Sequence, residues 1–328
     1  FLRGHTGKDP SSLSFSADGR LLISSGSDGI VFWDVPEGKR LGTIPLPEVP
    51  TAELTPDGMA LITASSIGLH RWPVRRSPGR LEIGPPHLLI DESAPERRAV
   101  ILPNGDSVIV ASDSANKLDI VSLRGVDREE IACDPMPNDV DISPDGKWIL
   151  ASSWQKKWMG IFELATKRRV KQVSFSQFPV RAFSPDGQRL LWGTRDGCQV
   201  VSTTNWEAMG QLSREITGQS GFSLAFNRDG LLLAVARVDG IVKLLDGNSY
   251  VELASLITPF PQIRGELAFS PDGTSLAMCT PGGVAIWDLR LIRSGLEKME
   301  LDWDQADLPP RTSVPVKLEV IIHEGTDG

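Results

Sequence analysis

Apolar residues recur along this chain at fixed distances from a short turn motif. The motif is a tetrapeptide that ends in Asp-Gly or Asn-Gly, a pair that tolerates the positive φ angles of hairpin turns. Its seven copies end at Gly19, Gly58, Gly105, Gly146, Gly187, Gly230 and Gly273. An apolar residue stands four positions before and three positions after each of these glycines. Each turn is therefore expected to join two strands.

The strands after these turns are apolar on consecutive positions, as in residues 21–23 and 231–233. Such a pattern indicates that both faces of the strand are buried. Gly19 and Gly273 are 254 residues apart over six intervals, or about 42 residues per repeat, which is the period of a four-stranded propeller blade. The sequence predicts an all-β fold in which residues 1–328 form one seven-bladed β-propeller of four-stranded antiparallel blades.

A second turn follows the first by ten residues in most repeats, and a third strand follows that turn. This strand carries Trp33, Trp72 or Trp287 at one shared offset in three of the repeats. The pattern is loosest in residues 91–137, where the turn at 113–117 is irregular. The third blade is thus where we expect the largest departure from the regular fold.

The first repeat combines Gly4-His5, Ser27-Asp28-Gly29 and Trp33-Asp34, and it resembles the WD-40 repeat family. In that family a His, a strand Ser or Thr, a turn Asp and a strand Trp form a hydrogen-bonded structural tetrad. The matching residues here are His5, Ser25, Asp28 and Trp33. The resemblance implies a non-catalytic platform for protein–protein interaction.

The last forty residues change from strand to helical spacing. Leu289, Ile292, Leu296 and Met299 predict an amphipathic helix over 289–301. The alternating pattern before residue 323 predicts a strand over 314–322, which would close the ring as the outer strand of the last blade. Residues 290–328 would then be a C-terminal helix plus a closing strand. The alternative is that residues 1–3 close the ring, as N-terminal strands do in much of the family.

This tail is similar to that of bacterial WD-repeat domains that are often fused behind a Ser/Thr protein kinase. The resemblance implies a scaffold or sensor role in a larger signalling protein. The sequence itself has no Gly-rich phosphate loop and no His-Arg-Asp catalytic loop, so kinase activity is not expected of this chain. Because Phe1 is not a start methionine, the chain is expected to be a domain of a longer protein.

Charge and composition narrow the classes of partner. A net charge of -8 and a pI near 5.2 argue against a nucleic-acid binder. The longest apolar run, residues 231–236, is far shorter than the ~20 residues of a membrane-spanning helix, so no membrane insertion is expected. Cys133, Cys198 and Cys279 have neither disulfide nor zinc-site spacing, which favours a cytoplasmic location unless the domain is tethered outside by an anchor. We expect a monomer.

Neither a cofactor nor a histidine metal site is expected, because none of the four histidines has an i, i+4 partner or a carboxylate-flanked spacing. An enzymatic alternative comes from carboxylates on the expected innermost strands. These are Glu53, Asp139, Asp141 and Glu266. Their oxygens could hold Ca²⁺ or Mg²⁺ as in propeller lactonases and related hydrolases.

A binding surface is expected where the loops between second and third strands gather at one end of the blades. In the fourth repeat this loop is unusually aromatic and basic, and neighbouring repeats add arginines. The candidate contact residues are Trp154, Lys156, Lys157, Trp158, Arg181, Arg195 and Arg237. Such side chains suit an acidic or phosphorylated peptide. The alternative is that the tryptophans pack under their own loop and that Arg181 pairs with Asp139 or Asp141.

Overall fold

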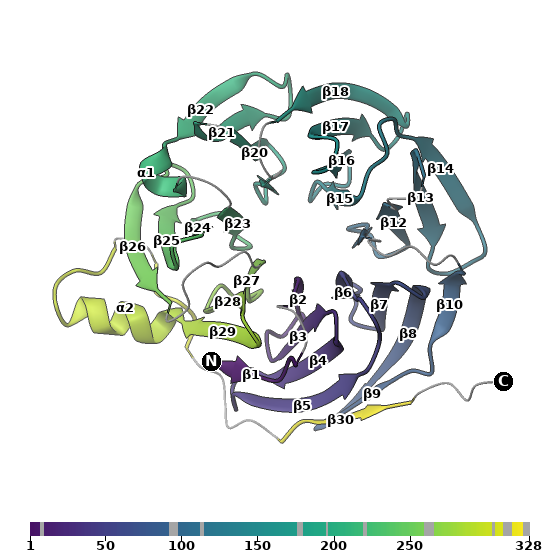
Figure 1. Ribbon diagram of the computed structural model, residues 1–328. Helices are drawn as coiled ribbons and strands as arrows, with labels where there is room; N and C mark the ends of the chain where they lie inside the picture. Colours follow the sequence, from purple (N-terminus) through teal and green to yellow (C-terminus); the bar gives the residue numbers. More distant parts are fainter. Residues whose placement is uncertain are drawn as a thin grey trace.

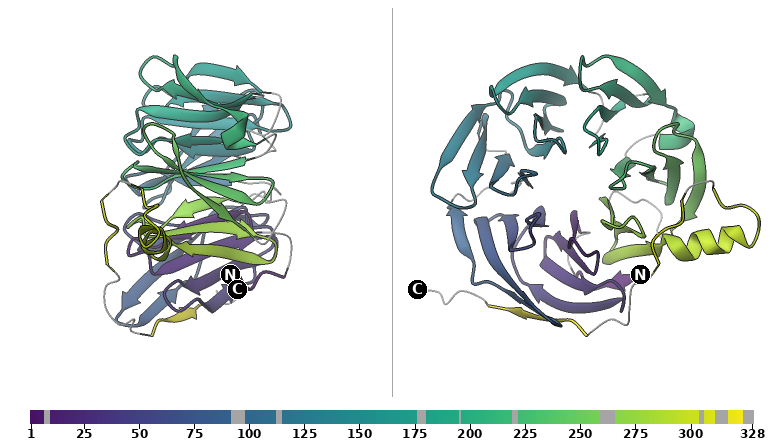
Figure 2. Two further views of the ribbon diagram at one scale, coloured as in Figure 1. Left: turned by 90° about the vertical axis from the view of Figure 1, so that its left-hand side faces the viewer. Right: turned by 180° about the vertical axis from the view of Figure 1, so that it is seen from behind.

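The computed structural model describes residues 1–6, 10–91, 98–111, 115–175, 180–194, 196–218, 222–258, 266–303, 306–310 and 317–323. Its strands form seven sheets arranged in a ring around a central axis (Figure 1). Seen from the side, the ring is a thick disc, and in the view from behind the helix α2 projects from its rim (Figure 2). The predicted seven-bladed propeller is confirmed. Within the described residues, no helix has the length and apolar character needed to cross a bilayer.

Five blades are regular four-stranded antiparallel sheets. Blade 1 contains β2 (Ser12–Phe15), β3 (Leu21–Gly26), β4 (Gly29–Asp34) and β5 (Lys39–Ile44). Blade 3 contains β11 (Arg98–Ile101), β12 (Ser107–Ala111), β13 (Lys117–Ser122) and β14 (Arg128–Ala132). Blade 4 contains β15 (Asp139–Ile142), β16 (Trp148–Ser153), β17 (Trp158–Glu163) and β18 (Arg168–Ser174). Blade 5 contains β19 (Arg181–Phe183), β20 (Arg189–Thr194), β21 (Gly197–Ser202) and β22 (Ala208–Leu212). Blade 6 contains β23 (Phe222–Phe226), β24 (Leu232–Arg237), β25 (Ile241–Asp246) and β26 (Glu252–Ile257).

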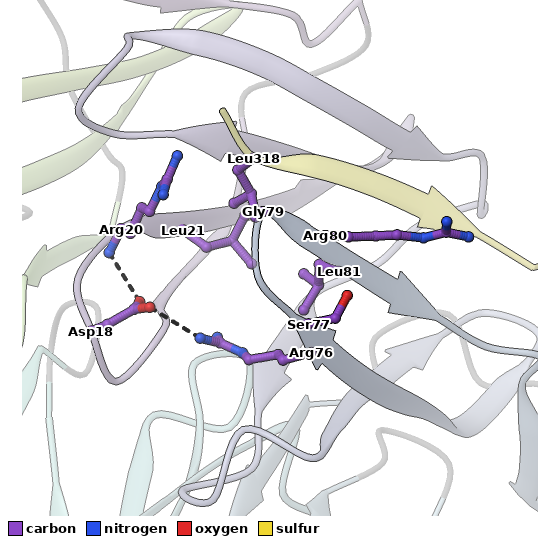
Figure 3. Close-up of a pocket in the computed structure, with 9 residues that line it drawn as sticks. All are labelled: Asp18, Arg20, Leu21, Arg76, Ser77, Gly79, Arg80, Leu81 and Leu318. Carbon is purple, nitrogen blue, oxygen red and sulfur yellow. Dashed lines mark hydrogen bonds and ion pairs between the residues drawn. The ribbon is translucent and has the colours of Figure 1, made fainter. Parts of the chain in front are cut away.

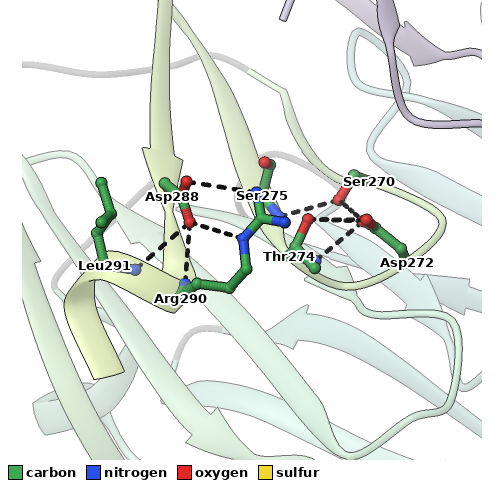
Figure 4. Close-up of polar contacts among 7 residues, drawn as sticks. All are labelled: Ser270, Asp272, Thr274, Ser275, Asp288, Arg290 and Leu291. Carbon is green, nitrogen blue, oxygen red and sulfur yellow. Dashed lines mark hydrogen bonds and ion pairs between the residues drawn. The ribbon is translucent and has the colours of Figure 1, made fainter. Parts of the chain in front are cut away.

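The repeated turn is stabilised by its own hydroxyl and carboxylate. In blade 4, the Ser143 hydroxyl donates to Asp145 at 2.5 Å and accepts from the Trp148 N–H at 2.8 Å. Gly146 then takes a φ of 72°, which a residue with a Cβ adopts only under strain. The same bonds recur in blade 7, where Ser270 and Thr274 surround Asp272 and lower the pKa of its carboxyl despite partial burial (Figure 4). The motif thus fixes each hairpin locally.

The core lies between the blades. The apolar residues three positions after each turn glycine are fully buried. They are Leu22, Leu61, Val108, Ile149, Leu190, Leu233 and Leu276. Because strands with two buried faces need neighbours on both sides, each blade depends on the two blades next to it.

Blade 2 departs most from the regular pattern. Its inner strands are β6 (Thr51–Leu54) and β7 (Ala60–Ser65), but β8 (Gly68–Ser77) is ten residues long. The first half of β8 pairs with β10 (His87–Ile90), and its second half pairs with β9 (Arg80–Ile83). The expectation that the third blade would be the irregular one was wrong, because blade 3 keeps four complete strands.

Blade 7 is closed by the N-terminus. Its strands are β27 (Leu267–Phe269), β28 (Ser275–Thr280) and β29 (Gly283–Asp288), and β1 (Leu2–Arg3) pairs with β29 as the outer strand. The prediction that residues 314–322 close this blade was wrong. Instead β30 (Glu319–Ile322) pairs in parallel with β9 of blade 2, while residues 314–316 lie outside the described residues. The physical reason is that β1 already pairs with this edge, whereas Val320 and Ile322 pack on the core between blades 1 and 2.

The predicted C-terminal helix is confirmed as α2 (Leu289–Glu297), although it ends earlier than residue 301. Asp288 caps it by accepting hydrogen bonds from the N–H groups of Arg290 and Leu291 (Figure 4). Leu289 is buried, and the chain that returns after the helix is held by Arg293, which pairs with Asp302. A second short helix, α1 (Arg214–Thr217), lies between blades 5 and 6 and was not expected.

Candidate functional site

The first blade holds a chain of buried hydrogen bonds. Trp33 Nε1 donates to Ser24 Oγ at 2.8 Å, and Ser24 Oγ lies 2.8 Å from His5 Nε2. His5 Nδ1 lies 2.7 Å from Asp28 Oδ1. Since an indole N–H only donates and a carboxylate only accepts, the bonds run from Trp33 through Ser24 and His5 to Asp28.

The expected tetrad is therefore present with one correction, because its serine is Ser24 and not Ser25. Side chains alternate between the two faces of a strand, and Ser24 lies on the same face as Leu22, the residue opposite Trp33. Ser25 lies on the other face, and its hydroxyl has no hydrogen-bond partner among the described residues. Blade 2 repeats part of the arrangement, since Trp72 Nε1 donates to Thr63 Oγ1 at 3.0 Å.

Side chains of the innermost strands bond across neighbouring blades. The Leu13 N–H donates to Glu266 at 3.3 Å, and the Ala99 N–H donates to the Thr51 hydroxyl at 3.2 Å. Glu53 accepts from the Ile101 N–H in the same way. An innermost strand has a free edge, so its N–H groups need other acceptors. These acidic and hydroxyl side chains supply them.

The carboxylates near the axis differ in the direction of their pKa shifts. Burial raises the pKa of Glu53 to about 7, and the nearby charge of Glu266 adds to the rise. Removal from bulk water near the axis raises the pKa of Glu266 against the opposing charge of Arg98, although the residue itself is exposed. Burial alone would also raise the pKa of Asp139, but Arg181 and Arg98 hold it below its usual value.

Arg181 belongs to this axial group. Its Nη1 lies 2.7 Å from Asp139 Oδ2, and its Nε lies 3.9 Å from Asp141 Oδ2. Only 11% of the Arg181 side chain is exposed. Arg181 thus pairs with these aspartates, as the alternative interpretation expected. The prediction that Arg181 belongs to the peptide-binding surface was wrong.

The carboxylates proposed for a metal site do not come together as ligands. Within the described ranges, no three His, Cys, Asp or Glu side chains are grouped so that they could hold a metal ion. Glu53 and Glu266 instead accept N–H groups from the next blade. The geometry gives the enzymatic alternative no support.

The aromatic loop of blade 4 lies on the face of the ring where the inner strands begin, which we call the Trp154 face. Trp154 is 44% exposed. In the amide orientation that satisfies both groups, Asn138 accepts from Trp154 Nε1 at 2.7 Å and donates to Ser152 O at 3.2 Å. Lys156 and Lys157 are exposed in the same turn. The indole is thus fixed by one edge while part of its surface faces solvent.

The other residues predicted for this surface lie in different environments. Trp158 is only 2% exposed and packs in the core between blades 3 and 4, so its assignment to the surface was wrong. As the first residue of β17 it pairs with Ser153 and Ser174, which leaves its ring between two sheets. Arg237 pairs with Asp239 and donates to Glu215 O. Arg195 lies outside the described residues.

The role of Asn138 was not predicted from the sequence. It stands just before β15, at the start of the inner strand of the same blade. The hairpin between β16 and β17 ends on the same side of the ring, which brings Trp154 to it. A polar residue before an inner strand, next to an aromatic second turn, is the signal that could have found this contact.

Comparison with known proteins agrees with the fold and with the first-blade tetrad. The model of the family "WD domain, G-beta repeat" matches residues 1–34. WD repeat-containing protein SL1-17 of Schistosoma mansoni is 30% identical over 157 residues, which are 46% of this chain and 50% of that protein. Pre-mRNA-processing factor 19 homolog 2 of Arabidopsis thaliana is 27% identical over 105 residues, which are 32% of this chain and 20% of that protein. The matches thus span half or less of these relatives.

Among solved structures, Kuenenia stuttgartiensis hydrazine synthase is similar with a TM-score of 0.70 over 88% of this chain and 99% of that chain. At 17% identity this likeness shows the fold alone. The chain is a seven-bladed β-propeller. Its first blade matches the WD-repeat model and carries the tetrad, and the chain is similar to WD-repeat proteins, whose propeller fold fits a protein-interaction scaffold.

Proposed function

We propose that this WD-repeat domain binds an acidic or phosphorylated peptide on its Trp154 face. The observation that carries the proposal is Trp154 itself, which is 44% exposed and held by Asn138. A fixed aromatic ring offers a large contact area at little cost in conformational entropy, which is why tryptophan is frequent at binding hot spots.

The charges beside Trp154 support the choice of partner. Lys156 and Lys157 are exposed within two and three residues of the indole, although the protein as a whole has a net charge of -8. A phosphate or carboxylate approaching this turn would meet two ammonium groups and the face of an indole. Charge-assisted hydrogen bonds of this kind are stronger than neutral ones. Arg195, which follows the corresponding strand of blade 5, is a further predicted contact.

The proposal is tested with fluorescence anisotropy on two degenerate peptide libraries, one centred on phosphoserine and one on serine. The wild-type domain should bind the phosphoserine library more tightly. The variant Lys156→Glu/Lys157→Glu should weaken that binding at least tenfold, because two attractive charges become repulsive. The charge-matched control Arg168→Glu/Lys298→Glu changes two exposed cations outside this loop and should bind as the wild type does.

Two outcomes would contradict the proposal. One is binding by Lys156→Glu/Lys157→Glu that equals that of the wild type. The other is an equal loss in the control variant, because this would show a general effect of net charge. Thermal unfolding of all three proteins should give similar midpoints, since the four substituted residues are exposed.

The wider context is also a proposal. The resemblance of the C-terminal tail to bacterial WD-repeat domains fused to Ser/Thr kinases supports a regulatory role in a larger signalling protein. We further propose that residues 1–328 act as one monomeric unit. Sedimentation equilibrium should give a mass near 35.7 kDa, and a dimer mass would contradict this.

A further inference from the structure

A pocket of about 140 Å³ lies beside the first turn of blade 1 (Figure 3). The strand order places this turn at the opposite end of the blades from the β16–β17 hairpin that carries Trp154. Three parts of the chain form the pocket: the first turn of blade 1 with the start of β3, the hairpin between β8 and β9, and the residue just before β30. The lining residues are Asp18, Arg20, Leu21, Arg76, Ser77, Gly79, Arg80, Leu81 and Leu318. The hollow therefore lies where the irregular second blade and the C-terminal segment meet blade 1.

Arginine guanidinium groups and the carboxylate of Asp18 form the polar side of this pocket. Arg20 pairs with Asp34 at 3.1 Å, and the Asp34 side chain is only 2% exposed. This buried partner fixes the guanidinium while 22% of the Arg20 side chain stays accessible. Arg76 donates from Nη1 to Asp18 at 3.1 Å. A guanidinium has five N–H donors in a planar fork, so one bond to Asp18 leaves Arg76 able to bind another anion.

Arg80 has a different role. It pairs with Glu82 at 2.8 Å, and its side chain extends along β9 away from Asp18 (Figure 3). Arg20 and Arg76 are thus the two arginines that remain as candidates to contact an anion in the pocket.

Leucines form the apolar side. Leu21 of β3 and Leu81 of β9 belong to the core between blades 1 and 2, and Leu318, which directly precedes β30, packs against the same core. The position of Leu318 is set by its neighbour, because the Glu319 N–H donates to Gly79 O at 2.8 Å. The pocket therefore offers guanidinium groups on one side and branched apolar side chains on the other.

We propose that this pocket binds a small organic carboxylate that carries a short branched apolar group. The carboxylate would lie between Arg20 and Arg76, and the apolar group would contact the three leucines. The volume is below the roughly 300 Å³ at which pockets for drug-sized ligands begin, so the ligand has few non-hydrogen atoms. Such a carboxylate can be a free metabolite or the C-terminal end of a peptide.

The test is isothermal titration of the whole domain with isovalerate at constant ionic strength. We expect a dissociation constant on the order of 1 mM, as suits a ligand of this size. Isovaleramide lacks the charge, and acetate lacks the branched group, so each should bind at least five times more weakly. Inorganic phosphate should also bind more weakly than isovalerate. N-acetyl-Leu with a free carboxylate distinguishes the two possible sources of the ligand. If it binds more tightly than isovalerate, the ligand is the C-terminal end of a peptide; if it binds more weakly, the ligand is a free acid.

Three variants locate the site. Arg76→Gln should weaken isovalerate binding about tenfold, whereas the control Arg75→Gln, an exposed neighbour outside the lining, should change it less than twofold. Leu318→Ala should weaken isovalerate about threefold and leave acetate unchanged. Arg20 is not substituted, because its loss would remove the guanidinium that pairs with the buried carboxylate of Asp34.

The proposal is overturned if isovalerate gives no binding heat at 20 mM, if isovaleramide binds equally well, or if Arg76→Gln binds as the wild type does. It stands apart from the peptide site, because Lys156→Glu/Lys157→Glu should leave isovalerate binding unchanged.

Discussion

Single hydroxyl groups carry much of the local specificity of this propeller. Five of the seven repeated turns have a Ser or Thr that bonds an Asp two residues later, as Thr55 bonds Asp57 in blade 2. The first blade adds Ser24, which links Trp33 to His5. Each hydroxyl both donates and accepts, so it can satisfy two buried groups at once.

Ser24→Ala should therefore destabilise the domain. The substitution leaves Trp33 Nε1 and His5 Nε2 buried without their partner, which should lower the free energy of unfolding by about 2 kcal/mol. Ser25→Ala in the same strand is the matched control and should cost less than about 0.5 kcal/mol. Urea unfolding followed by tryptophan fluorescence measures both. Equal losses would mean that the buried hydrogen-bond chain does not contribute as described.

Glu53 gives a prediction for pH. Its pKa is about 7 in the folded protein against an ordinary value of 4.5, so the folded state binds more protons between these values. The stabilisation is complete below about pH 4.5 and is lost as the pH rises through about 7. Glu53→Gln keeps an acceptor oxygen for the Ile101 N–H but cannot titrate.

The measurement compares the free energy of unfolding of wild type and Glu53→Gln from pH 5 to 7.5. The wild type should lose stability relative to the variant as the pH rises. The comparison removes the opposing contribution of His70, whose pKa is lowered by burial and whose stabilisation grows with pH. A constant difference across this range would show that Glu53 does not titrate there.

The N-terminal strand β1 and the C-terminal strand β30 stabilise different parts of the ring. Leu2 of β1 is 8% exposed and packs between blades 1 and 7, while Val320 of β30 packs between blades 1 and 2. Leu2→Asp should lower the free energy of unfolding by about 3 kcal/mol, because it puts a charge into the closure of the ring. Val320→Asp should cost less, since its strand only covers an existing edge.

Hydrogen–deuterium exchange shows which strand of the ring each of the two terminal strands protects. Leu2→Asp should increase exchange in β29, and Val320→Asp should increase exchange in β9. The opposite pattern, with faster exchange in β29 for Val320→Asp, would restore the C-terminal strand as the closing strand of blade 7.

Local signals predicted the seven hairpins, because the turn chemistry and both apolar columns lie within eight residues. The partner of residues 319–322 could not be predicted in this way. The alternation of apolar and polar residues in this segment predicts a strand with one buried face, but it does not show which sheet edge the strand joins. The long β8 was missed for a related reason: its second half pairs with β9 only because the Ser77–Arg80 turn reverses the chain there.

The candidate site shows the same limit. Sequence placed Trp154, Lys156 and Lys157 at the surface, where the structure has them. It also placed Trp158 there, although this residue opens β17 and its side chain turns into the core. Which of two tryptophans four residues apart is buried depends on where the strand begins, and strand boundaries are the least certain feature of a sequence pattern.

At the scale of the whole molecule, the ring keeps its two proposed sites apart. Trp154 lies where the inner strands begin, and the pocket of Arg20 and Arg76 lies by the repeated turns at the other end of the blades. An acidic domain with localised cations attracts anions at defined points instead of over its whole surface. Binding of a peptide on the Trp154 face is the central claim.

The most direct test is ¹⁹F NMR of the domain labelled with 5-fluorotryptophan, in which each of the nine tryptophans gives one signal. Trp154→Phe assigns the Trp154 signal. On titration with the phosphoserine library, the Trp154 signal should shift, while the signals of buried Trp33 and Trp158 should stay in place. An unshifted Trp154 signal under saturating phosphoserine peptide, or an equal shift with the serine library, would contradict the account.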